Sequence, residues 1–115
     1  MEDLLKKESV KRVNNFIKQF DSSLEIIVLD KTARTAKDAA TALNCEVGAI
    51  VKSLVLRADN GFLICLVAGD KRCSLNKLKK LIGKKDVSMA DAEQVKLQTG
   101  FSIGGVAPVA HLNKL

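Results

Sequence analysis

Two apolar runs separated by a turn signal constrain the fold of this chain more than any other feature of its sequence. Residues 50–57 and 62–68 are dominated by aliphatic and β-branched side chains, and Asp59-Asn60-Gly61 lies between them. Asx and Gly residues between two such runs are typical of β-hairpins, because they accept the positive φ angles that tight turns need. The sequence therefore predicts two strands joined by this turn.

Helical signals precede and follow the hairpin. Apolar side chains recur at helical spacing after residues that can cap a helix, and asparagine or glycine stands where most of these runs end. We expect helices that begin after Ser9, Thr35, Ser74 and Ser88 (with Asp91), the last three ending near Asn44, Gly83 and Gly100. In the third helix the side chains expected to face inward are Leu75, Leu78, Leu81 and Ile82. With a further strand predicted over residues 24–29, these elements indicate one α+β domain.

The size and composition fit a single globular domain spanning residues 1–115. Hydrophobic residues make up 47% of the 115 residues and charged residues 28%, as in ordinary folded domains. No apolar run approaches the ~20 residues that span a bilayer, and residues 1–7 are too polar for a secretory signal. We therefore expect a cytoplasmic protein with no membrane partner.

The three cysteines form neither a disulfide framework nor a zinc-site pattern, because their number is odd and no Cys-x-x-Cys pair occurs. Cys45 and Cys65 lie in apolar surroundings and are expected to be buried. Lys71 and Arg72 precede Cys73, and their charges could lower the pKa of its thiol. We expect no metal and no other cofactor.

Positive charge is concentrated in one segment, residues 71–85. The net charge of the chain is +6, and this segment holds seven basic residues and no acidic one. They are Lys71, Arg72, Lys77, Lys79, Lys80, Lys84 and Lys85. Such a block either attracts nucleic-acid phosphates without reading their sequence or forms a solvated face of a surface helix. With four Phe and no Trp or Tyr in the chain, stacking on single-stranded bases is not favoured.

Lys52 interrupts the apolar pattern of the first predicted strand. Side chains alternate between the two faces of a strand, so Lys52 shares a face with Leu54 and Leu56. A lysine on an apolar face is costly unless its ammonium meets an anion or a wet cleft. The alternative is an inward-pointing charge that protects a sheet edge from aggregation.

Residues 99–111 gather unusual backbone chemistry. Three of the seven glycines and the only proline of the chain fall within residues 100–108. Gly104 and Gly105 let main-chain amides approach a ligand closely, and Pro108 restricts the backbone beside them. This segment is either a loop that binds a carbonyl oxygen or a phosphate, or an ordinary tight turn between strands.

Lys52 in the segment 50–56, together with residues 99–111, closely resembles the YbaK/prolyl-tRNA-synthetase-associated domain family of aminoacyl-tRNA deacylases. The resemblance runs from about Val13 to the end of the chain and includes Arg34-Thr35-Ala36, Ala39-Ala40 and the Gly69-Asp70 turn. It implies a mixed, mostly antiparallel sheet flanked by helices. It also implies metal-independent hydrolysis, in trans, of the ester of misacylated tRNA, often of the tRNA-Pro type, as a second sieve for translation. The implied partners are the tRNA acceptor end and an aminoacyl-tRNA synthetase.

The resemblance also assigns roles to individual residues. Lys52 matches the lysine that anchors the phosphate and ribose of the terminal adenosine, and Gly104 and Gly105 belong to the loop whose main chain holds the scissile carbonyl and a water. That water is thought to be helped by the substrate's own 2′-hydroxyl, without a covalent nucleophile. The other residues implied to bind the substrate are Ser53, Ala36, Ala39, Ala40, Val106, Ala107, Pro108 and His111. The basic residues of segment 71–85 would hold the acceptor stem.

The chain departs from the family at one point. Relatives continue for roughly another strand and helix beyond the Gly-Gly…Pro motif, whereas this sequence stops at Leu115. An acidic residue often found in that part has no counterpart here. Two other functions therefore stay open: a non-catalytic module of the same fold that binds tRNA or a synthetase, and a hydrolase or binder of small molecules.

Overall fold

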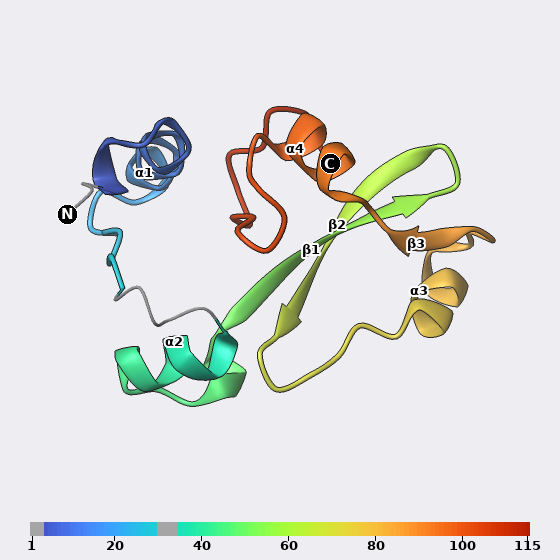
Figure 1. Cartoon of the computed structure of the whole chain (residues 1–115), viewed down its shortest axis with the longest axis horizontal. Coiled ribbons are helices and arrows are strands. Elements are labelled where there is room, and N and C mark those ends of the chain that lie inside the picture. Colours follow the sequence, from blue (N-terminus) through green and yellow to red (C-terminus); the bar gives the residue numbers. More distant parts are fainter. Residues whose placement is uncertain (1–3, 30–34) are drawn as a thin grey trace.

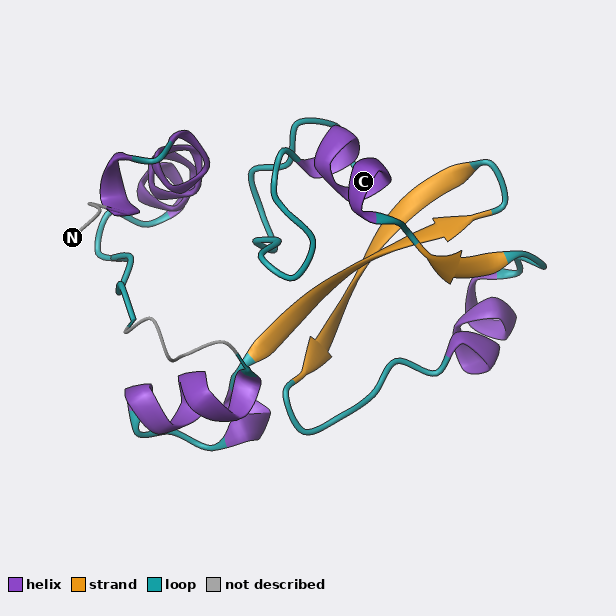
Figure 2. Cartoon of the chain, in the orientation of Figure 1, coloured by secondary structure: helices purple, strands orange, loops and turns teal. Residues whose placement is uncertain are grey.

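An antiparallel sheet of three strands forms the centre of the structure, with helices on both faces and at one end (Figures 1 and 2). The structure is a computed structural model, and it describes residues 4–29 and 35–115. The elements are, in chain order, a 3-10 helix η1 (Leu4–Lys6), α1 (Glu8–Phe20), α2 (Ala36–Leu43), a 3-10 helix η2 (Val47–Ala49), β1 (Val51–Ala58), β2 (Gly61–Ala68), α3 (Leu75–Ile82), β3 (Val87–Met89) and α4 (Ala92–Thr99).

The predicted hairpin is confirmed, and it is the larger part of the sheet. β1 and β2 pair along their whole length, from Val51 opposite Ala68 to Ala58 opposite Gly61. The sheet order is β2-β1-β3, and β3 pairs only with Leu56–Ala58. In the described part of the chain, residues 51–54 of β1 therefore have no partner strand on the side away from β2.

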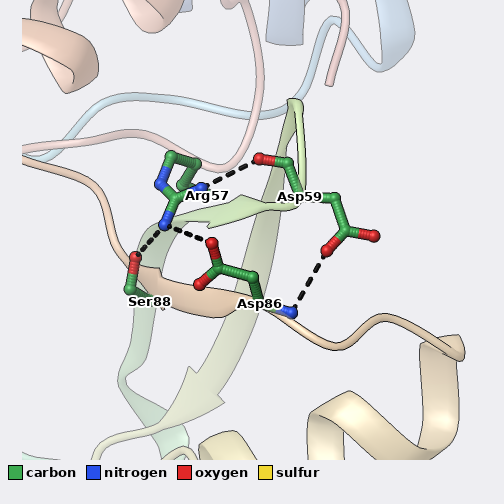
Figure 3. A network of polar contacts seen from close by, with 4 residues as sticks. All are labelled: Arg57, Asp59, Asp86 and Ser88. Carbon is green, nitrogen blue, oxygen red and sulfur yellow. Dashed lines mark hydrogen bonds and ion pairs between the residues drawn. The ribbon is translucent and has the colours of Figure 1, made fainter.

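Strand β3 was not predicted, and a polar network holds it against the hairpin (Figure 3). Arg57 on β1 donates to the Asp86 carboxylate at 3.0 Å, to Ser88 Oγ at 3.3 Å and to the Asp59 carbonyl at 2.9 Å. The Asp59 carboxylate in turn accepts from the backbone N–H of Asp86 at 3.1 Å. Ser88 is thus a strand residue and not a helix cap.

The two faces of β1 bury different clusters, because neighbouring side chains point to opposite sides. Val55 packs with Ala90 and Val95, which places α4 on one face. Leu56 and Ala58 pack on the other face with Val87 and with the apolar side of α3. Leu75, Leu78 and Ile82 supply that side, as predicted. Leu81, which was also expected to face inward, is 82% exposed, because the helical spacing turns it away from the side formed by Leu75, Leu78 and Ile82.

Three of the four helices begin and end largely as the sequence predicts. Thr35 and Ser74 accept from the N–H groups of Asp38 and Lys77, and the left-handed residues Asn44, Gly83 and Gly100 end α2, α3 and α4. The cap of α4 is Asp91, in a capping box with Gln94. Ser9 is not a cap, because α1 already begins at Glu8. The α+β class is confirmed.

The segment between α1 and α2 corrects the sequence prediction. Residues 24–29 form no strand, although their composition favours one, because no neighbouring strand pairs with them in the described structure. α1 forms as predicted, yet none of its described residues is fully buried, and Phe20 is 83% exposed.

Over residues 4–29 and 35–115, no helix combines the length and the apolar character needed to cross a bilayer.

The contrast between Leu56 and Leu81 gives a direct test of this core. Leu56 is completely buried, so Leu56→Ala should lower the free energy of unfolding by about 2–5 kcal/mol. Leu81→Ala removes the same atoms from an exposed site and should change it by less than about 0.5 kcal/mol. Urea unfolding followed by circular dichroism measures both. Equal losses in the two variants would contradict the packing of α3 described above.

Candidate active site

A cavity of about 650 Å³ lies along the unpaired edge of β1. Residues 50–55 form one wall, and the start of α2 with Ala36 and Ala39 forms another. Ala90 and Val95 close the floor on the α4 side, and residues from the glycine-rich segment, among them Gly104 and Val106, form the remaining wall. The cavity therefore brings together the two sequence features that stood out separately, the lysine-bearing strand and the glycine-rich loop.

Lys52 lines this cavity and is half-buried. Its ammonium donates to the carbonyl oxygen of Lys71 at 3.3 Å, on the face of the sheet that carries Leu56 and α3. Ser53 lines the cavity from the opposite face of the strand. Because the cavity follows a strand edge, residues from both faces reach it. Among the described residues its hydrogen-bond partner is this neutral carbonyl, so the ammonium has the charge to bind an anion entering the cavity.

Residues 102–105 form a β-turn at the rim of the cavity. The N–H of Gly105 donates to the carbonyl of Ser102 at 2.9 Å, and Gly104 has a φ of +82°, as type II turns require at their third position. A tight turn is therefore present in this segment, but it follows α4 and does not join two strands. Gly104 lines the cavity, and within the described chain its N–H has no hydrogen-bond partner. Gly105 is not among the cavity-lining residues, and its N–H is already engaged.

The second half of the loop turns away from the cavity. Val106 lines it and packs against the Val55 cluster, whereas Ala107, Pro108 and His111 do not line it. The half-buried ring of His111 lies with Nε2 2.7 Å from the Ala107 carbonyl and packs edge-on against Phe101. These three residues thus lie where they can support the loop from behind.

Helix α2 is held close to the sheet by Gly69. A Cβ at Gly69 would clash with the Val47 carbonyl and lie 3.0 Å from Cβ of Ala36, so only glycine allows this approach. Ala36 and Ala39 line the cavity as the resemblance implies, and their small side chains leave room beside β1. Ala40 is buried at 2% exposure and does not line it. Arg34 lies outside the described residues.

The described lining of the cavity is positive and carries no obvious acid or base. Lys37 lines it together with Lys52, and the sequence analysis had not singled out Lys37. The sequence signal that could have indicated Lys37 was its position in the first turn of the helix capped by Thr35. No lining residue in the described part carries a carboxylate, an imidazole or a thiol, and residues 4–29 and 35–115 hold no metal-binding cluster of three or more His, Cys, Asp or Glu.

The basic segment 71–85 is spread along the molecule. Lys71 and Arg72 are exposed in the connection that leaves β2, and Lys71 contacts Lys52 at the cavity. The connection then runs to α3, which packs under the other end of β1 (Figure 1). The other basic residues lie on or after α3 and are exposed, except for the half-buried Lys79. An extended track that starts at the cavity is therefore present.

Comparison with known proteins identifies the family. Residues 30–115 match the model of the aminoacyl-tRNA editing domain, and the chain belongs to this family. It is 38% identical over 82 residues to the proline–tRNA ligase of Thermosipho africanus and 34% identical over 82 residues to that of Caldicellulosiruptor saccharolyticus. Each match covers 71% of this chain, which spans only 15% and 14% of the lengths of those ligases.

A solved structure has the same fold. It is described as a candidate trans-editing enzyme for prolyl-tRNA synthetase, and it superposes with a TM-score of 0.88 at 40% sequence identity. The match covers 95% of this chain and 69% of that chain. The YbaK-like architecture implied by Lys52 and residues 99–111 is thereby confirmed.

The cysteines lie outside the cavity, and two expectations about them are wrong. Cys45 is exposed instead of buried, because it follows the end of α2 in a surface turn. Cys73 Sγ lies 3.9 Å from Cys65 Sγ. Desolvation by burial, with a smaller contribution from the contact with Cys65, raises the pKa of the Cys73 thiol. The neighbouring basic side chains do not lower it, because they point into solvent.

These positions predict the order in which the thiols react. Cys45 should be alkylated by iodoacetamide at least about tenfold faster than Cys73 near pH 8, because Cys45 is exposed and the raised pKa keeps Cys73 protonated. The rate at Cys73 should keep rising as the pH passes 9. Mass spectrometry of peptides after timed labelling measures both rates. Labelling of Cys73 first would show that its thiol is activated and not suppressed.

Proposed function

We propose that this chain is a metal-independent aminoacyl-tRNA deacylase, which hydrolyses in trans the ester of misacylated tRNA of the tRNA-Pro type. The observation that carries the proposal is that Lys52, Ser53 and the Gly104 turn line one cavity in a chain of the editing family. The tRNA acceptor end is the expected partner, and the relatedness to proline–tRNA ligases supports a synthetase as a second one.

The charges and shapes around the cavity suit the end of an aminoacylated tRNA. Lys52 and Lys37 supply two cations for the phosphate and ribose of the terminal nucleotide, and the Lys52 ammonium would exchange its bond to the Lys71 carbonyl for a charged oxygen. The amino-acid side chain would then lie against Ala36 and Ala39. This orientation places the ester between β1 and the Gly104 turn.

The reaction needs a water and a donor for the developing negative charge. Water adds to the ester carbonyl, the C–O bond to the ribose breaks, and the ribose oxygen takes a proton to give free amino acid and tRNA. The N–H of Gly104 can stabilise the oxyanion, an effect worth about 3–4 kcal/mol where one such donor has been removed from another enzyme. Because the described lining offers no base, proton transfer through the substrate's 2′-hydroxyl fits the site.

The rest of the tRNA would follow the basic track. Lys71 and Arg72 lie next to the cavity and would meet the first phosphates of the acceptor stem, with the lysines on and after α3 farther along. These contacts attract any phosphate backbone and do not select a tRNA. Selectivity among amino acids would come from the part of the cavity bounded by Ala36 and Ala39.

Lys52→Ala should reduce kcat/KM for deacylation of mischarged tRNA-Pro by about tenfold to a hundredfold, the worth of one charged hydrogen bond. Lys18→Ala, which removes a lysine of α1 outside the cavity, should leave kcat/KM unchanged. A panel of mischarged tRNAs, followed by release of the labelled amino acid, provides the measurement. Hydrolysis by the wild type with no loss in Lys52→Ala would remove Lys52 from the site. Binding of tRNA without hydrolysis would establish the non-catalytic module instead.

The basic track predicts a strong dependence of tRNA affinity on salt. Each lysine that contacts a phosphate contributes about 0.7–0.9 to the negative slope of log affinity against log salt concentration. Lys71→Ala and Lys77→Ala should therefore each reduce this slope by about one, with Lys18→Ala as the charge-matched control. Fluorescence anisotropy of labelled tRNA across a salt series measures it. Equal slopes in all four proteins would show that segment 71–85 is only a solvated surface.

A further inference from the structure

Arg12 on α1 binds both ends of the glycine-rich loop. Its Nε donates to the carbonyl of Ala110 at 2.7 Å, and its Nη2 donates to the carbonyl of Thr99 at 3.1 Å. These two carbonyls lie where the chain enters and leaves the loop, 87 and 98 residues away in sequence. The planar guanidinium presents several donors in fixed directions and can hold two such acceptors at once.

Aromatic contacts surround the same guanidinium. Cζ of Arg12 lies 4.6 Å from the centre of the Phe101 ring, and Phe101 is only 5% exposed. The ring of His111 packs edge-on against Phe101, with the two ring centres 6.1 Å apart. A cation over an aromatic face adds to the hydrogen bonds, most strongly where water is partly excluded. Arg12 is therefore held in place by the loop that it binds.

The loop needs such a contact at its exit. Ala110 has a φ of +65°, a left-handed conformation that costs free energy for any residue with a Cβ and persists only where its surroundings impose it. The carbonyl of Ala110 is the acceptor of the short bond from Arg12. Two backbone bonds close the base of the loop beside it, from Leu112 N to the Thr99 carbonyl at 3.2 Å and from Asn113 N to the Gln98 carbonyl at 3.0 Å. The Arg12 contact thus stabilises the strained exit directly.

The far end of the loop has few restraints of its own. Ile103, Gly104 and Gly105 are exposed, and Gly105 has its single turn hydrogen bond to Ser102. Val106 packs against the Val55 cluster and anchors one point. The position of the Gly104 N–H relative to β1 is therefore determined by Val106 and the His111–Ala107 hydrogen bond on one side and by the two ends of the loop on the other.

We infer that Arg12 is a positioning residue for the active site, which sets the Gly104 turn at the cavity by clamping the loop at Thr99 and Ala110. Its hydrogen bonds go to Thr99 and Ala110, which do not line the cavity, so it acts through the loop backbone. None of the described residues of α1 is fully buried, so the helix contributes little to the core, but through Arg12 it is hydrogen-bonded to the loop. The effect of Arg12 on the loop does not depend on the proposed function, whereas its effect on catalysis rests on that function.

Hydrogen exchange tests the effect on the loop without any substrate. Arg12→Met keeps a long side chain with good helix propensity but has no donors. It should raise exchange of the hydrogen-bonded amides of the loop and its base, those of Gly105, Leu112 and Asn113, by about tenfold, while amides of β1 and β2 exchange as in the wild type. Arg12→Lys keeps the charge and should give an intermediate rate. Lys11→Ala, an exposed neighbour on the same helix, is the control and should change nothing. Unchanged exchange in Arg12→Met, or a uniform rise over the whole chain, would overturn the inference.

Deacylation by the same variants tests the effect on catalysis. Displacement of a catalytic group by about 1 Å can cost about a hundredfold in rate, so Arg12→Met should lower kcat by tenfold to a hundredfold with KM for tRNA within about twofold. Arg12→Lys should recover part of kcat. Loss of affinity with kcat unchanged would make Arg12 a tRNA-binding residue and overturn its positioning role. If the wild type shows no hydrolysis, the proposed function fails, and the exchange experiment still decides whether Arg12 orders the loop.

Discussion

The incomplete pairing of β1 is the constraint on which the rest of this structure depends. β2 covers the whole of β1 on one side, but β3 covers only Leu56–Ala58 on the other. The paired half is buried from both faces, by α4 over Val55 and by α3 over Leu56. The unpaired half, residues 51–54, is open at its edge and lines the cavity. One strand thus supplies the completely buried Leu56 and a wall of the site, so the site has a rigid base.

A site of this composition must act by position and charge. In the described lining, the polar contributions are two lysines, two hydroxyl residues and backbone groups, and the remaining lining residues are apolar or glycine. The described lining holds no carboxylate or imidazole beside the hydroxyl groups to activate them as nucleophiles. The polar groups of the lining can hold an anionic substrate and stabilise a developing oxyanion, which is sufficient where the substrate brings its own hydroxyl and water. The small side chains of α2 fit this mode of action, because they leave room for the substrate and offer no reactive group.

The elements that were predicted correctly are those determined by contacts between residues close together in the sequence. The hairpin follows from two apolar runs around Asp59-Asn60, and Thr35, Ser74 and Gly83 delimit helices because capping is a contact within a few residues. Strand β3 could not be predicted in this way, since its three residues form a strand through Arg57 and the edge of β1. Residues 24–29 illustrate the reverse case, a strand-like composition without a partner. The prediction that Leu81 faces inward is wrong for a related reason. The eight-residue helix α3 has more leucines than its one buried side can take.

The glycine-rich loop likewise combines a feature that its own residues determine with one that depends on residues far away in the sequence. Its turn was visible in the sequence, because a glycine such as Gly104 accepts the positive φ that a tight turn needs whatever surrounds it. Which amide would be available was not visible, since that depends on the bond from Gly105 to Ser102 and on where the turn lies against β1. That placement depends on Arg12, which contacts the loop across 87 and 98 residues of sequence and belongs to no motif. A site built from backbone groups is thus positioned only as precisely as the distant residues that hold it. Residues that touch no substrate can therefore control the rate of the reaction.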